Sequence, residues 1–203
     1  GNTPGDLAIT ESWNGTNWTE VNDLNTARRE LAGAGSSNTN ALAFGGGPPT
    51  KVETETWNGT NWTEVNNLNS SRQQLAGNGT NTSALGIGGN TPGGITTNTE
   101  LWNGTNWTEV NNLNTGRYIL AAAGTDNTSA LAFAGDTPPA TGKTEDWNGA
   151  SWAETSDMST ARKQLAGSGV TTSALASTGT TGSLTTATEE WNVPSNVVKT
   201  LTD

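Results

Sequence analysis

The sequence predicts an all-β fold built from one repeated unit, and three observations support this. The string WNGTNWTEVN occurs at residues 13–22, 57–66 and 102–111, and diverged copies begin at Trp147 and Trp191. Successive copies start 44 or 45 residues apart. Each period divides into four short segments bounded by Gly, Pro or Asn, a pattern typical of strands and turns. Because units of this length with four strands are typical of propeller blades, the sequence predicts a β-propeller of four-stranded antiparallel blades.

The unit at residues 28–71 shows how the four strands are expected to form. Residues 28–35 are mostly small and precede a polar turn, whereas residues 41–44 are apolar and end in three glycines. Residues 52–57 and 62–66 each carry a tryptophan and are joined by Asn58-Gly59, a strong hairpin signal. We expect the small segment to be the crowded innermost strand and the indoles to fill the widening space between blades. No segment has a sustained helical period.

The repeats define a single domain over residues 1–203 with one incomplete unit. Trp-bearing strand pairs occur five times, but the pairs that precede them occur only four times. The predicted complete blades are residues 28–71, 72–116, 117–161 and 162–203, and residues 1–27 supply two strands of an N-terminal half blade. A five-bladed ring is the expected closure, and the incomplete blade is a candidate site of self-association.

Composition argues against several classes of function. The formal net charge is -10, so the basic stripe that nucleic acid requires is missing and insertion into an anionic membrane is disfavoured. The chain has no histidine and no cysteine, which excludes nucleophilic triads and the common zinc sites. Acidic residues recur at the same repeat positions, whereas an active site is a singular arrangement. The sequence therefore predicts no enzyme activity, no metal and no cofactor.

Two sets of recurring side chains are candidates for binding or for structure. Four arginines open the small-residue segments, and they would either bind an anionic ligand at one mouth of the central channel or pair with a repeat glutamate. These are Arg28, Arg72, Arg117 and Arg162. The tryptophans would either form the core between blades, which we favour, or stack on sugars. They are Trp13, Trp18, Trp57, Trp62, Trp102, Trp107, Trp147, Trp152 and Trp191.

One class of loop varies between repeats that are otherwise nearly constant. The loops at residues 46–51, 89–98, 135–143 and 179–186 differ in length and content. In a four-stranded meander, these loops share one end of the blade with the starts of the innermost strands. Because recognition usually resides in variable loops on a rigid scaffold, any binding is expected on this face.

The repeat resembles the kelch repeat in the order of its residues. Arg28 is followed by a small-residue strand, an apolar strand ending in Gly-Gly, then Trp57 and, five residues later, Trp62. The unit differs from kelch in having Trp57 where tyrosine is usual. Its Asn/Thr-rich, nearly identical repeats resemble those of tail-associated bacteriophage virion proteins.

The resemblance implies a non-enzymatic module of a virion appendage, located on the virion or outside the cell. Its expected partners are other virion proteins or a cell-surface glycan, which it would bind for assembly or host attachment. The alternatives are a multivalent sugar-binding lectin with pockets between blades and an artificial consensus-repeat scaffold.

Overall fold

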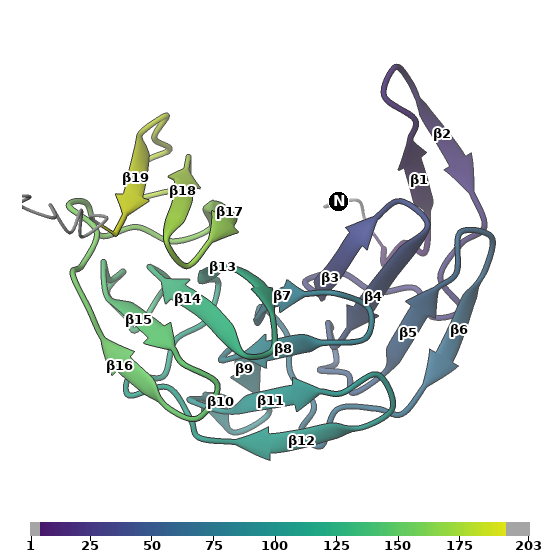
Figure 1. Ribbon diagram of the computed structural model, residues 1–203, viewed down its shortest axis with the longest axis horizontal. Helices are drawn as coiled ribbons and strands as arrows, with labels where there is room; N and C mark the ends of the chain where they lie inside the picture. The colour runs from purple at the N-terminus through teal and green to yellow at the C-terminus, as the bar shows by residue number, and fades with distance from the viewer. Residues whose placement is uncertain (1–4, 194–203) are drawn as a thin grey trace, which may run out of the picture.

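The computed structural model describes residues 5–193, and this part of the chain contains strands but no helix. Four antiparallel sheets follow one another along an arc as the four blades of a β-propeller (Figure 1). The first blade consists of β3 (Ala32–Ser37), β4 (Asn40–Phe44), β5 (Thr54–Trp57) and β6 (Trp62–Val65). The second consists of β7 (Ala76–Gly79), β8 (Ala84–Ile87), β11 (Thr99–Trp102) and β12 (Trp107–Val110). The third consists of β13 (Ala121–Asp126), β14 (Ser129–Phe133), β15 (Thr144–Trp147) and β16 (Trp152–Glu154).

The fourth blade is described for three strands, β17 (Ala166–Val170), β18 (Ser173–Ser177) and β19 (Thr188–Asn192). Its predicted outer strand lies outside the described residues. In each blade we call the first two strands the inner hairpin. The Trp-bearing strands that follow them form the outer hairpin. The loops between them, the inner–outer loops, span residues 45–53, 88–98, 134–143 and 178–187.

At the N-terminal end of the arc, β1 (Thr10–Trp13) and β2 (Trp18–Val21) form a separate two-stranded sheet. This hairpin has the register of an outer hairpin, but within residues 5–193 no inner hairpin pairs with it. A fifth half blade is therefore not confirmed, and closure into a five-bladed ring stays a prediction. A further small hairpin, β9 (Asn90–Thr91) and β10 (Gly94–Ile95), lies within the second inner–outer loop and was not predicted.

The Asn-Gly turns form as four-residue loops closed by the asparagine side chain. In the first blade, Trp57 pairs with Trp62 across the outer hairpin. Asn58 Oδ1 accepts the N–H groups of Thr60 and Asn61, both at 2.9 Å. Gly59 has φ +91°, a conformation that a side chain disfavours. The same turn recurs in the β1–β2 hairpin and in the outer hairpins of the second and third blades, which explains why the Asn-Gly sequence repeats there.

The small-residue strands are innermost, as predicted, because neighbouring blades approach closely there. The inner strands β3, β7, β13 and β17 contact one another in succession along the inside of the arc (Figure 1). A Cβ on Gly77 would lie 2.6 Å from the carbonyl oxygen of Gly33 and 2.8 Å from the ring of Phe44. The spacing of the first and second blades therefore requires glycine at position 77.

Replacing Gly77 with alanine is expected to destabilise the fold by about 1–3 kcal/mol, because the added methyl group has no space. Gly93 is the matched control, since a Cβ there meets only a threonine hydroxyl at 3.6 Å. Urea denaturation of both variants measures the difference. Equal midpoints for Gly77→Ala and Gly93→Ala would contradict the close packing of inner strands.

Truncating Trp102 to alanine should lower the free energy of unfolding by about 3–5 kcal/mol, because it removes a large buried ring. Its side chain is 1% exposed, whereas Trp13 at the same repeat position is 43% exposed. Trp13→Ala should therefore cost much less in the same denaturation experiment. A similar loss for both variants would show that burial does not explain the role of these indoles.

Candidate functional site

Five of the tryptophans predicted as core are buried between or within blades. They are Trp57, Trp102, Trp107, Trp147 and Trp152. On the inner of the two Trp-bearing strands, the indole N–H donates to a carbonyl in the inner-hairpin turn of its own blade, as Trp102 does to Asn81 at 3.0 Å. On the outer strand it donates to a threonine of the preceding blade, as Trp107 does to Thr54 Oγ1 at 3.0 Å. The indoles therefore tie each blade to its neighbour.

The remaining tryptophans are more exposed. Trp62 and Trp191 are half-buried, whereas Trp13 and Trp18 of the N-terminal hairpin are 43% and 64% exposed. Both Trp13 and Trp18 lie at positions that are buried in the second and third blades. Trp13 is exposed because no inner hairpin lies beside β1 in the described structure. Trp18 is exposed because no blade precedes its hairpin within residues 5–193, whereas Trp107 packs on the preceding blade.

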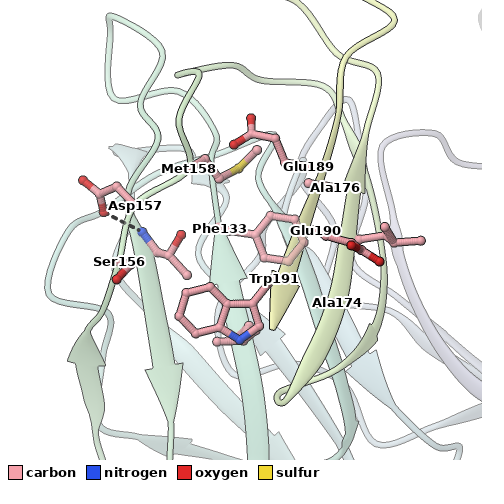
Figure 2. A pocket seen from close by; sticks show the side chains of 12 residues that line it. Phe133, Ser156, Asp157, Met158, Ala174, Ala176, Glu189, Glu190 and Trp191 are labelled. Atoms are coloured by element: carbon pink, nitrogen blue, oxygen red, sulfur yellow. Dashed lines mark hydrogen bonds between the residues drawn. The ribbon is translucent and has the colours of Figure 1, made fainter. Parts of the chain in front are cut away.

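A cavity of about 70 Å³ lies between the third and fourth blades (Figure 2). Phe133, Met158 and Trp191 form its apolar lining, and Thr144 and Glu189 are polar groups beside it. At the corresponding place between the first and second blades, the ring of Trp107 packs on Phe44 at 4.8 Å. The cavity thus lies at the position that an outer-strand indole fills between the first and second blades.

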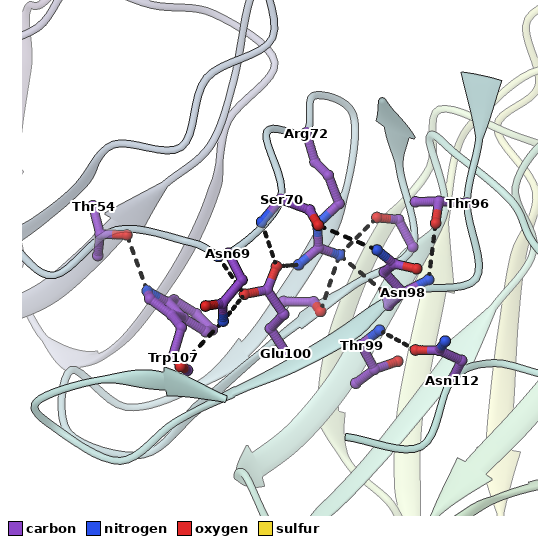
Figure 3. A network of polar contacts seen from close by, with 12 residues as sticks. Thr54, Asn69, Ser70, Arg72, Thr96, Asn98, Thr99, Glu100, Trp107 and Asn112 are labelled. Carbon is purple, nitrogen blue, oxygen red and sulfur yellow. Dashed lines mark hydrogen bonds and ion pairs between the residues drawn. The ribbon is translucent and has the colours of Figure 1, made fainter. Parts of the chain in front are cut away.

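The four candidate arginines are buried at the starts of the inner strands. Arg72 is fully buried, and its Nη2 lies 2.9 Å from Glu100 Oε1 (Figure 3). Its Nη1 donates to the carbonyl oxygens of Gly88 and Asn98, each at 2.9 Å. Both Nη atoms are therefore paired within their own blade, whereas Nε is buried without a hydrogen-bond partner among the described residues.

The second carboxylate oxygen of Glu100 holds the connection that arrives from the preceding blade. Its Oε2 accepts the backbone N–H of Asn69 at 2.7 Å and the side-chain Nδ2 at 2.8 Å. Asn69 Nδ2 also donates to the carbonyl oxygen of Trp107 on the outer strand. We call the set Asn69, Arg72 and Glu100 the carboxylate clamp of the second blade (Figure 3).

The clamp occurs once in every blade. The equivalent sets are Asn25–Arg28–Glu55, Asn114–Arg117–Glu145 and Ser159–Arg162–Glu189. In the fourth set a serine replaces the asparagine and donates through its N–H and hydroxyl groups. None of the four guanidinium groups faces an open channel mouth, so the geometry favours the structural alternative over an anion-binding ring.

Burial disfavours the charged form of these arginines. Desolvation lowers the pKa of Arg72 and of Arg117 below the ordinary value, and the attraction of Glu100 and Glu145 works in the other direction. A guanidinium is basic enough to stay protonated in a protein. Each buried cation therefore depends on its glutamate partner.

The inner–outer loops lie on the face that bears the starts of the inner strands. The residue after each clamp arginine bridges to the adjacent loop through its backbone, in the pairs Arg29–Gly47, Gln73–Asn90, Tyr118–Asp136 and Lys163–Thr180. The backbone pairing is the same in each blade, but the side chains differ in size and charge. This face therefore combines a fixed backbone with changing chemistry, which the sequence predicted for it.

One cluster on this face joins the third and fourth blades. Tyr118 Oη donates to Asp136 Oδ2 at 3.1 Å, and Lys163 Nζ forms an ion pair with the same oxygen. The hydrogen bond to Asp136 raises the pKa of Lys163, and desolvation raises that of Tyr118. The cluster fixes the third inner–outer loop against its neighbour.

A depression of about 230 Å³ is lined by the residues that immediately precede the four inner strands, and we call this place the mouth of the arc. Four residues with left-handed backbone surround it, with φ between 47° and 57°: Glu30, Gln74, Ile119 and Gln164. The N–H of Gln74 donates to the Glu30 carbonyl at 2.8 Å, and that of Ile119 to the Gln74 carbonyl at 2.8 Å. Sequence reasoning missed this series of inter-blade hydrogen bonds, because no Gly or Asn marks the left-handed position.

Two kinds of feature are absent from the described residues. Between residues 5 and 193, no group of acidic side chains is arranged to hold a metal ion. That part of the chain also contains no helix with the length and apolar character needed to cross a membrane.

Replacing Glu100 with alanine should destabilise the protein by about 3–5 kcal/mol, because it leaves the Arg72 charge buried without a partner. Glu11 occupies the same repeat position on β1 but is exposed and has no ion pair within residues 5–193. Glu11→Ala should therefore have a much smaller effect on the urea midpoint. Equal effects of the two substitutions would contradict the structural role of the clamp.

Comparison of the chain with protein-family models and with curated proteins finds no match. The kelch-like and bacteriophage interpretations therefore rest on the sequence resemblance alone.

Proposed function

We propose that this propeller is a non-enzymatic binding module of a bacteriophage virion appendage, which mediates protein contacts or host attachment through the face of the inner–outer loops. One observation is the main support for this proposal. Side-chain variation is concentrated on this face, although the carboxylate clamps and the hydrogen bonds at the mouth hold its backbone in the same way in each blade. Variable groups on a fixed frame are the usual arrangement of a recognition surface in repeat proteins.

The opposite face of the propeller varies much less between blades. There the outer-hairpin turns present the same asparagine-capped loop in successive blades, at Asn14, Asn58, Asn103 and Asn148. A surface that repeats one polar turn offers little to distinguish one partner from another. Specific recognition is thus better served by the loop face.

Apolar groups at the tips of the loops support protein contact. Ile95 is 42% exposed at the β9–β10 hairpin, and Leu184 is 93% exposed in the fourth inner–outer loop. A hollow of about 380 Å³ lies beside Leu184 and is otherwise lined by polar residues and one glycine. Exposed apolar side chains rimmed by polar groups are typical of sites that bind other proteins.

Sugar binding between blades is the alternative, and the cavity in Figure 2 is the observation that favours it. Trp191 and Phe133 could stack on a sugar there, next to the carboxylates of Glu189 and Glu190. However, indoles fill the corresponding places between the other described blades, whereas a multivalent lectin needs the pocket repeated. We therefore place protein contact or attachment first.

The test uses fluorescently labelled protein on an array of glycans and on a panel of whole bacterial cells. The double variant Ile95→Ser/Leu184→Ser should lose cell binding by about tenfold or more, as expected when central apolar contacts are removed. The matched control, Thr60→Ala/Thr105→Ala, alters exposed turns on the opposite face and should bind normally.

Three outcomes would contradict the proposal. Normal cell binding by the loop-tip variant, together with loss in the turn variant, would place recognition on the other face. Binding to glycans that Trp191→Ala abolishes would establish the lectin alternative. Failure of the wild-type chain to bind any cell would argue against attachment.

A further inference from the structure

The N-terminal hairpin carries the residues of a complete outer hairpin in the standard register. Glu11 on β1 pairs with Glu20 and Trp13 with Trp18, as Glu55 pairs with Glu64 and Trp57 with Trp62 in the first blade. On β5 these groups face an inner hairpin, because β4 pairs along the strand. On β1 that edge is unpaired within the described residues.

The hairpin is nevertheless docked on the first blade in the normal way. Trp62 Nε1 donates to Thr10 Oγ1 at 3.0 Å, the same contact that Trp107 makes with Thr54. Asn38 Nδ2 donates to the carbonyl oxygen of Trp13 at 3.1 Å. β1 is therefore already held at the position that a blade requires.

The contacts on the open side of β1 are lacking. In complete blades the clamp glutamate is buried and accepts from an arginine and an asparagine, as Glu55 does from Arg28 at 2.6 Å and from Asn25 at 2.7 Å. Glu11 is exposed and accepts from none of residues 5–193. The Trp13 indole N–H likewise has no acceptor in this range, although the equivalent Trp57 donates to a turn carbonyl at 3.0 Å.

We propose that β1 is an acceptor edge for one kind of partner, an inner hairpin of this same repeat type supplied by another polypeptide segment. Its Asn-x-x-Arg sequence would clamp Glu11, and its turn would accept the Trp13 indole N–H. Its apolar strand would pair with β1 and cover Trp62, which is only half-buried whereas Trp107 is 5% exposed. The four complete clamps of the structure define the chemistry of this partner, independently of what the loop face binds.

A peptide of residues 111–135 is the probe, because it contains Asn114, Arg117 and both inner strands of the third blade. Titration of this peptide into the whole chain, followed by calorimetry and tryptophan fluorescence, should give one-to-one binding. Arg117→Ala in the peptide should weaken binding by about tenfold or more, since it removes one partner of a buried charge pair. Glu11→Gln in the protein should weaken binding similarly, and the two changes together should not be additive.

Glu20→Gln is the matched control, because Glu20 is the exposed cross-strand neighbour of Glu11 and has no role in the proposed contact. It should leave peptide affinity unchanged. Binding that is insensitive to both Arg117→Ala and Glu11→Gln would overturn the proposal, and so would an equal loss in Glu20→Gln.

The free peptide must form a hairpin before it can bind. A fusion of the same residues to the chain tests the proposal without this requirement. Residues 111–135 placed before Gly1 would leave eleven residues between the apolar strand and β1, the length of the loop between β8 and β11. The fused chain should have a higher melting temperature and a more buried Trp13, and Glu11→Gln should remove both effects. A fusion without these effects would overturn the proposal. A dimer of the unmodified chain that Glu11→Gln dissociates would show that a whole second copy, not a separate hairpin, occupies β1.

Discussion

The buried glutamate of the carboxylate clamp is the interaction on which the rest of the structure depends. A carboxylate in this position is costly unless its acceptor sites are filled, and Glu100 fills them with Arg72 and Asn69. The three residues come from an outer strand, the start of an inner strand and the connection from the preceding blade. Satisfying one carboxylate therefore fixes the register of the outer strand and the position of the neighbouring blade together.

This polar network explains how a chain that is only 31% hydrophobic forms a stable core. Apolar clusters join adjacent blades, and the indoles within them donate to specific partners, as Trp152 does to Thr99 Oγ1 at 3.1 Å. Because a buried carboxylate or indole N–H is costly without a partner, each blade needs its neighbour. The exposed Trp13 and Glu11 show what the same residues look like where one set of contacts is missing.

The strands of the described blades could be predicted from the sequence because they depend on local signals. The Asn58-Gly59 turn, the small residues at 32–35 and the regular tryptophans each specify their own segment. Pairing of Arg72 with a repeat glutamate was one of the two predicted alternatives. The sequence could not identify Glu100 as the partner, because it lies 28 residues away and the two meet only when the blade is paired. The left-handed Ile119 was missed because its conformation is imposed by hydrogen bonds to the adjacent blades. Ring closure stays a prediction for the same reason, since it depends on contacts at the ends of the arc.

Amide hydrogen exchange tests the central role of the clamp most directly. The backbone N–H groups of Asn69 and Asn114 lie in loops but donate to buried carboxylates at 2.7 Å. Those of Thr60 and Asn61 lie in a loop too, and they donate to an exposed side chain at 2.9 Å. If the clamp holds the blades together, the Asn69 and Asn114 amides should exchange as slowly as strand amides, and those of Thr60 and Asn61 should exchange much faster. Exchange of all four amides at the same fast rate would contradict the account.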